Sequence, residues 1–294
     1  MSGARVAVLQ FPGVNCELET LRAVTRAGLD AELFRWTRAA RELAGFDAFV
    51  LPGGFSWQDR VRAGALAAKD PLVEALAERA QAGAPVLGIC NGAQVLVEAG
   101  LVPGAARVAG GRISGECVEV ALAPNRMPDR VGYYTRWVWC RIEDSACVFT
   151  RGLSAGTLLP LPVAHGEGRF TAVKKTRLAQ LADAGQAPLR YATQSGAIAN
   201  EFPDNPNGAD AAVAGLCNAR GNVLALMPHP ERATELGQLS RSIAGTWGSR
   251  RDRALAAGDG SAFGDGPGME LFHALARHLS RPESEPVSEP RAGA

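Results

Sequence analysis

Short apolar runs alternate with amphipathic segments through the first hundred residues, and this alternation constrains the fold more than any other feature. The apolar runs, which we predict as buried strands, are residues 6–9, 31–34, 47–51 and 85–89. The segments with helical spacing are residues 17–27, 71–81 and 92–99. Apolar strands separated by helices are typical of a parallel sheet covered on both faces. The sequence therefore predicts an α/β fold with a central, mostly parallel sheet and helices on both faces.

The second half of the chain is richer in strand-like segments. The predicted strands are residues 117–122, 136–142, 158–164, 189–193, 212–217 and 222–227, and a last helix is predicted at 269–279. These strands predict an additional strand-rich region. Residues 237–266 carry few large apolar side chains, so we expect an exposed insertion with a short helix. Residues 281–294 contain mostly Pro, Ser, Glu and small side chains, so we expect a disordered tail.

The charge balance and the cysteine pattern exclude several classes of protein. The 294 residues include 31 Lys+Arg and 30 Asp+Glu, which argues against a nucleic-acid binder or a polybasic membrane-surface protein. No secretory signal is visible, and no apolar run approaches the ~20 residues that span a bilayer. We therefore expect a cytoplasmic location with reduced thiols. Six cysteines without a C-x-x-C pair and four histidines without paired spacing predict no disulfide framework and no dedicated metal site.

The sharpest local motif is GICNG at residues 88–92, between an apolar strand and a helix. It has the form G-x-C-x-G, the thiol counterpart of the nucleophile elbow. A tight turn holds the nucleophile in a strained backbone conformation, and flanking glycines remove the clashes. The helix N-terminus favours a thiolate at Cys90, and the backbone N–H of Asn91 can face a developing oxyanion. We therefore predict Cys90 as a nucleophile, against the plainer interpretation of a buried cysteine in a turn.

The segment MPHPE at residues 227–231 supplies a candidate base. Pro230 favours an extended conformation at His229, which places residues i and i+2 on the same side. Glu231 can then orient the imidazole and stabilise its cation, as an acid does in a Ser-His-Asp triad. The segment alone is also typical of a turn. Together with the thiol elbow, it predicts a Cys90–His229–Glu231 triad.

Three further positions are open to more than one interpretation. The segment PGGF at residues 52–55 follows a strand. It is interpreted either as the second half of an oxyanion hole, formed by backbone N–H groups near Gly54, or as a simple turn. His165 lies in the loop HGEGR at residues 165–169, either as a second base or as a structural residue. Cys16 precedes a helix but lacks the flanking glycines of an elbow, so we interpret it as a packing residue.

Several blocks of the sequence resemble the class I glutamine amidotransferases, and among them the glutaminase subunits of phosphoribosylformylglycinamidine synthases. The blocks are FPGVNC at residues 11–16, LPGGFS at 51–56, LGICNGAQ at 87–94, GLVPG at 100–104, RWV at 136–138, AHGEGR at 164–169, NPNG at 205–208 and MPHPER at 227–232. They run in family order from about residue 5 to about residue 235. The resemblance implies the flavodoxin-like fold of that family and a single domain over residues 1–280.

The resemblance implies a glutaminase that supplies ammonia for purine biosynthesis. In this family the thiol attacks the side-chain amide of glutamine, here at Cys90, and water then hydrolyses the thioester to glutamate. The resemblance places glutamine and its oxyanion near Gly54, Asn91 and Gln94, with the triad histidine moving the protons. It implies no cofactor and no metal in this chain, whereas the synthetase partner uses ATP and magnesium. A small accessory subunit is a further expected partner.

One departure and two alternatives remain at this point. The segment GYYT at residues 132–135 stands where the family pattern has a segment like Ser-Gly-Arg-Phe-Glu, which leaves the partner interface and the ammonia path open. The triad fits equally a class I glutaminase that serves another acceptor synthetase, and only the wider blocks disfavour it. A catalytically silent interaction subunit on the same fold is disfavoured by the intact triad.

Overall fold

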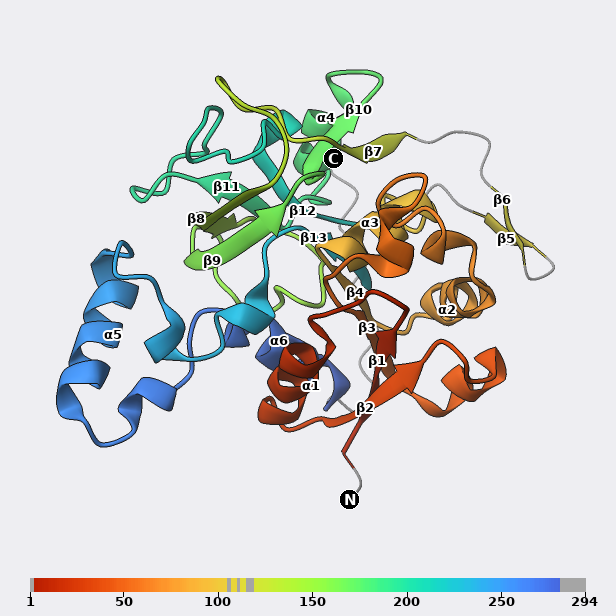
Figure 1. Ribbon diagram of the computed structural model, residues 1–294, viewed down its shortest axis with the longest axis horizontal. Helices are drawn as coiled ribbons and strands as arrows, with labels where there is room; N and C mark the ends of the chain where they lie inside the picture. Colours follow the sequence, from red (N-terminus) through yellow and green to blue (C-terminus); the bar gives the residue numbers. More distant parts are fainter. Residues whose placement is uncertain (1–2, 105–106, 110–111, 115–118, 281–294) are drawn as a thin grey trace, which may run out of the picture.

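A nine-stranded mixed sheet forms the centre of the protein (Figure 1). The computed structural model describes residues 3–104, 107–109, 112–114 and 119–280. Within these residues the strand order is β2-β1-β3-β4-β13-β12-β11-β8-β9. The first five strands in this order pair in parallel and are β2 (Asp30–Arg35), β1 (Arg5–Gln10), β3 (Ala48–Leu51), β4 (Val86–Ile89) and β13 (Val223–Leu226). The prediction of buried parallel strands in the first half of the chain is confirmed.

The strand-rich region continues the same sheet with antiparallel pairs. These strands are β12 (Val213–Cys217), β11 (Leu189–Ala192), β8 (Tyr134–Ile142) and β9 (Leu158–His165). Two short ribbons stand outside the sheet and pair β7 (Val120–Ala123) with β10 (Arg169–Ala172) and β5 (Arg107–Ala109) with β6 (Arg112–Ser114). The strand predicted at 117–122 corresponds to β7, and its residues 117–118 lie outside the described residues, as does the predicted tail at 281–294.

Helices cover both faces of the parallel half of the sheet (Figure 1). Helix α1 (Glu17–Arg26) packs beside α6 (Met269–Leu279), and the other face carries α2 (Pro71–Gln81) and α3 (Asn91–Glu98). Helix α4 (Arg177–Asp183) and strand β10 have no counterpart among the sequence predictions. Short 3-10 turns lie at Ala40–Gly45, Ser56–Asp59, Ala67–Lys69, Asp210–Ala212, Pro230–Arg232, Leu236–Gln238 and Ser261–Phe263. In the part of the chain that the structure describes, no helix combines the length and apolar character needed to cross a membrane.

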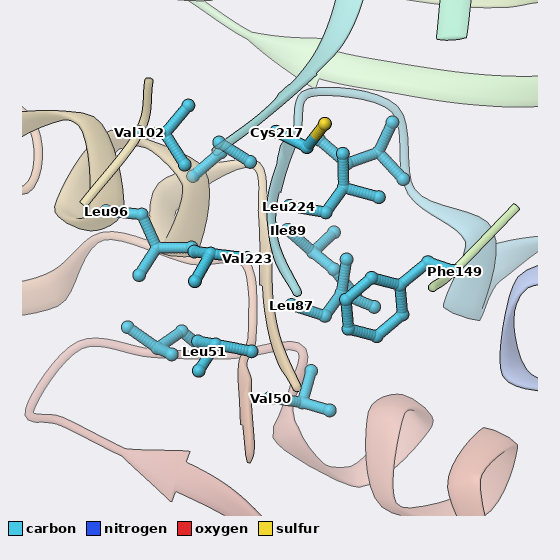
Figure 2. Close-up of a cluster of buried hydrophobic side chains, with 14 of the residues drawn as sticks. Val50, Leu51, Leu87, Ile89, Leu96, Val102, Phe149, Cys217, Val223 and Leu224 are labelled. Atoms are coloured by element: carbon cyan, nitrogen blue, oxygen red, sulfur yellow. The ribbon is translucent and has the colours of Figure 1, made fainter. Parts of the chain in front are cut away.

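A cluster of buried hydrophobic side chains surrounds the pair formed by β4 and β13 (Figure 2). Leu87 and Ile89 of β4 lie against Leu224 of β13, with Leu96 of α3 and Phe149 beside them, and all five side chains are fully buried. Burying side chains of this size contributes about 1.5–3 kcal/mol each. The two strands that carry the candidate site are therefore held in the buried core of the molecule.

Residues 237–266 form a lobe that projects from the sheet and contains α5 (Gly245–Ala257) (Figure 1). Most of its residues are exposed, which agrees with its shortage of large apolar side chains. Its inner contacts centre on Arg251, which is buried and donates to the backbone carbonyl groups of Ser240 and Ile243. Asp265 pairs with Arg26 of α1 and ties the base of the lobe to the main body.

Candidate active site

Cys90 occupies the turn between β4 and α3 with φ 50° and ψ −104°. This left-handed backbone costs a non-glycine residue about 1–3 kcal/mol and persists only where the surroundings hold it. The flanking glycines are required by close packing: a Cβ on Gly88 would lie 2.5 Å from the carbonyl oxygen of Gly92, and a Cβ on Gly92 would lie 2.0 Å from that of Leu51. The two glycines therefore allow the strained strand-to-helix turn at Cys90 that the sequence predicts.

His229 and Glu231 lie next to this elbow because β13 is the neighbour of β4. Ile89 pairs with Leu226 across the two strands, and the backbone N–H of Cys90 donates to the carbonyl of Leu226 at 2.7 Å. The His229 Nδ1 and Glu231 Oε1 atoms are 2.5 Å apart, and both residues are buried. Glu231 lies in the 3-10 turn Pro230–Arg232, so the contact arises from this turn and not from an extended strand as the sequence suggested.

The charge on His229 is set by its neighbours. Burial alone would lower the pKa of His229, but the carboxylate of Glu231 and the thiols of Cys90 and Cys16 raise it well above its usual range. Among the described residues, the second ring nitrogen, Nε2, has no hydrogen-bond partner. These neighbours favour the imidazolium form of His229, with Nδ1 paired to Glu231 and Nε2 left without a partner among the described residues.

Five of the seven predicted site residues line one cavity of about 210 Å³, and Asn91 and Glu231 are not among its lining residues. Cys90, His229, Gly54, Gln94 and His165 all line it. This volume lies below the ~300–1,000 Å³ typical of drug-sized ligands, so the cavity suits a small metabolite. Residues far apart in the sequence thus converge on one small site.

Asn91 and Gln94 use their side chains to join the cavity walls. The Asn91 amide accepts from the backbone N–H of Ser56 and donates to Asp59 and Gln94 at 3.1 and 2.9 Å. The Gln94 amide donates to the carbonyl of Glu167 at 2.7 Å. Asn91 is the first residue of α3, so its backbone N–H has no acceptor within the helix and is available to an oxyanion.

Gly54 reaches the cavity because a loop from the first strand packs against it. Gly54 has φ 143°, and a Cβ at this position would lie 2.6 Å from the backbone nitrogen of Asn15. Asn15 and Cys16 donate their N–H groups to the carbonyl of Gly53. Only glycine fits at this close approach, which explains the adjacent glycines after β3.

His165 is neutral. Burial first, and then the nearby positive charge of His229, lower the pKa of His165 to about 3. Its Nδ1 lies 3.1 Å from the side-chain oxygen of Asn125, and that amide also binds the backbone at His165 and Gly168. The low pKa and the contacts with Asn125 favour the structural interpretation of His165 over that of a second base. Asn125 therefore holds this loop in place through its side-chain hydrogen bonds, and no sequence motif indicated it.

The cavity also carries ionisable side chains that the sequence did not indicate. Asp59 and Glu167 bring two carboxylates, and Arg232 brings a guanidinium. Partial burial first, and then the charge of Glu167, raise the pKa of Asp59 to about 6, although Asn91 donates to it. Tyr133 lines the cavity as well. It belongs to the GYYT segment at residues 132–135, which differs from the family pattern. These residues come from separate loops, so no local spacing could have grouped them.

Comparisons with known proteins identify the family of this chain. A model of the CobB/CobQ-like glutamine amidotransferase domain matches residues 3–276. The chain is 42% identical over 287 residues to the phosphoribosylformylglycinamidine synthase subunit PurQ of Methanothrix thermoacetophila, covering 95% of this chain and 100% of that protein. The chain belongs to the PurQ family of glutamine amidotransferases. The family and the fold class inferred from the sequence are therefore confirmed.

Other PurQ relatives and a solved structure support the same assignment. The PurQ subunit of Thermus thermophilus is 43% identical over 231 residues, which covers 79% of this chain and 90% of that protein. A chain in the structure of PurLQS from Thermotoga maritima is similar with a TM-score of 0.67 and 26% identity. The match covers 94% of this chain and 99% of that one. The PurQ likeness thus extends over nearly the whole chain.

Proposed function

We propose that this chain is the glutaminase subunit of a phosphoribosylformylglycinamidine synthase, with Cys90 as the nucleophile. The observation that carries the proposal is the thiol elbow and the His229–Glu231 pair on adjacent strands of one cavity. Membership of the PurQ family supports the substrate and the pathway, which is purine biosynthesis.

The geometry supports a two-step reaction. The thiolate of Cys90 attacks the side-chain amide carbon of glutamine, and the N–H groups near Gly54 and Asn91 stabilise the oxyanion. His229 donates its proton to the departing amino group, which leaves as ammonia. Water then attacks the thioester while His229 takes a proton back, and glutamate and the free thiol are released. Glu231 keeps the imidazole in place and stabilises its charged form throughout.

The charges in the cavity fit the two ends of an amino acid. Asp59 and Glu167 are suited to the α-ammonium group of glutamine, and Arg232 is suited to its α-carboxylate. The raised pKa of Asp59 supports this role, because two carboxylates that repel each other gain from a cation between them. Gln94 lines the same space and completes the substrate contacts.

The ammonia goes to a partner in this proposal. The relatives are named as synthase subunits, and the solved relative is named PurLQS, which supports a synthetase partner. That partner uses ATP and magnesium, and this chain carries no cofactor of its own. A small accessory subunit completes the complex, which acts in the cytoplasm. A net charge of +1 suits a subunit whose phosphate-bearing substrates bind to its partner.

The test uses the assembled complex with a Cys90→Ala subunit. We expect glutamine-dependent formation of the amidine product to disappear, and ammonia-dependent formation to stay, because only the first requires the thiol. Hydroxylamine added to the wild-type complex should trap the thioester as γ-glutamyl hydroxamate. Glutamine-dependent activity that survives in Cys90→Ala would exclude this nucleophile.

A further inference from the structure

We propose that Tyr133 makes the cavity specific for free glutamine, by donating its phenol hydrogen to the α-carboxylate that Arg232 also binds. This inference deepens the proposed function and rests on it for the identity of the substrate. Tyr133 lines the cavity together with Cys90 and Arg232, and 56% of its surface is exposed, whereas Cys90 is buried. The phenol therefore stands at the mouth of the cavity, and the thiol lies deeper.

The backbone at Tyr133 is held in place, although the side chain is largely exposed. The carbonyl of Gly132 accepts from the side-chain amide of Asn125 at 3.1 Å. On the other side, Tyr134 begins β8 and pairs with His165 at the end of β9. The Cβ of Tyr133 therefore has a fixed position at the edge of the cavity, as precise orientation of a substrate requires.

The phenol lies within electrostatic range of the groups at the centre of the site. Partial burial first, and then the negative charge of Cys90, raise the pKa of Tyr133. Two positive groups, His229 and Arg232, act in the opposite sense. The interaction with the guanidinium is mutual: burial alone would lower the pKa of Arg232, but its neighbours raise it, and Tyr133 is one of them. A phenol with a raised pKa keeps its proton at neutral pH and donates it in a hydrogen bond.

Arg232 and Tyr133 together match the hydrogen-bonding capacity of a carboxylate. A guanidinium carries five N–H groups. Among the described residues, the hydrogen bonds of Arg232 are made by Nη2, which lies 3.1 Å from the Cys16 sulfur and 3.5 Å from Glu19 Oε1. A carboxylate has about four lone-pair sites, which is more than one edge of a guanidinium fills. A phenol O–H beside the guanidinium adds a further charge-assisted bond, which is shorter and stronger than a bond between neutral groups.

Two fixed ends select the substrate by its length and by its charge. The thiol of Cys90 must reach the side-chain amide while Tyr133 and Arg232 hold the α-carboxylate. Asparagine is one methylene shorter and cannot satisfy both ends. Glutamine with an amidated α-carboxyl group, as in a peptide, has no anion for the two donors. A site built to hydrogen-bond one group rejects an analogue that lacks this group more strongly than it rejects a change of one methylene.

The neighbouring tyrosine provides a matched control. Tyr133 and Tyr134 are adjacent in the GYYT segment, yet Tyr134 is not among the residues that line the cavity. Its ring instead lies 5.5 Å from that of Phe202, and the guanidinium of Arg130 stacks over it at 4.3 Å. Replacing either tyrosine by phenylalanine removes one phenol oxygen and keeps the ring, so only the position of the lost hydroxyl differs.

The activity test compares Tyr133→Phe with Tyr134→Phe in the assembled complex. The substrates are L-glutamine and its α-amide, in which a neutral carboxamide replaces the carboxylate. We expect Tyr133→Phe to raise the KM for glutamine about 10-fold, with a smaller change in kcat and little change in the KM for the α-amide. Tyr134→Phe should leave both KM values unchanged. An equal rise in KM for both substrates, or the same rise in Tyr134→Phe, would overturn the proposal.

A binding test separates this proposal from the proposed function. Glutamine is titrated calorimetrically into the purified full chain that carries Cys90→Ala, alone or together with Tyr133→Phe, and thermal melting checks the folding of both. We expect the second substitution to raise the Kd about 10-fold. Equal Kd values would refute the role of Tyr133 even in an active glutaminase. If wild type bound glutamine but released no ammonia, the proposed function would fail, and the change in Kd would still decide the role of Tyr133.

Discussion

Replacing Asp59 by asparagine should make the protein more stable and a weaker glutamine binder. Asp59 is half-buried at the cavity, where desolvation and Glu167 hold its pKa near 6. Asparagine keeps the shape and can still accept from the Asn91 amide. It also tolerates the positive φ of 50° at this position better than most residues do. The substitution therefore removes a charge that the folded state disfavours.

The size of the effect follows from the pKa. Because the folded value of about 6 exceeds the ordinary 3.8, ionised Asp59 destabilises the fold by at most about 3 kcal/mol above pH 6. Solvent screening of a half-exposed group reduces this to about 1–1.5 kcal/mol. The penalty is absent below the unfolded pKa and grows as the pH rises through the folded pKa. At pH 5 it should be about half of its value at pH 7.5.

Urea unfolding at pH 7.5 and at pH 5 measures the two free energies of unfolding. Asp59→Asn should gain about 1–1.5 kcal/mol over wild type at pH 7.5 and about half of that at pH 5. The exposed Asp129 provides the control, since Asp129→Asn changes the net charge equally without removing a buried charge. A gain that does not depend on pH would come from the backbone alone and would refute the electrostatic reasoning.

The same variant tests substrate recognition. Losing a charge-assisted contact of about 1.5–3 kcal/mol should raise the KM for glutamine about 10- to 100-fold, with a smaller change in kcat. Steady-state assays of the complex with glutamine measure both constants. An unchanged KM would mean that the α-ammonium group binds elsewhere. Asp59→Asn is thus expected to raise the free energy of unfolding and to lower the affinity for glutamine.

Three other substitutions have defined outcomes. Glu231→Gln should lower the glutamine-dependent kcat about 10²- to 10⁴-fold, because the imidazolium loses its anionic partner, and a loss below tenfold in a steady-state assay would contradict this role. Gly92→Ala should lower the free energy of unfolding by about 1–3 kcal/mol in a urea titration, because its Cβ would lie 2.0 Å from the carbonyl oxygen of Leu51. Asn125→Ala should cost about 2–4 kcal/mol by the same measurement and raise the KM for glutamine, because it leaves buried groups of the loop at His165 unpaired; an unchanged KM would argue against a link to the cavity.

The part of the site that the sequence predicted depends on local backbone requirements. The elbow around Cys90 is recognisable because two glycines must stand at fixed positions between a strand and a helix. His229 and Glu231 were paired by proximity along the chain, although a 3-10 turn makes the contact. Helices at 71–81 and 269–279 were predicted at their observed bounds because apolar periodicity and Gly or Pro signals agree there.

The part that the sequence did not predict depends on long-range packing. Asp59, Glu167 and Arg232 converge from three loops, and each is an ordinary charged residue in its own segment. Cys16 was interpreted as a packing residue, yet its sulfur and the His229 ring pack around the same glycine, Gly53, at the cavity. Helix α4 is only seven residues long, which gives too few turns for a periodic signal.

The pairing of β4 with β13 places Cys90 and His229 at the ends of two buried strands, which we expect to be among the last segments to open. The amide of Cys90 is bonded to Leu226, and both strands are fully buried. Amides in such strands exchange with solvent only when the whole domain unfolds, whereas the exposed lobe around α5 can open alone. Insertions or deletions in the outer segments should therefore leave the relative positions of the Cys90 thiol and the His229 imidazole unchanged. We therefore expect outer segments such as the lobe around α5 to tolerate sequence changes that leave the cavity unaltered.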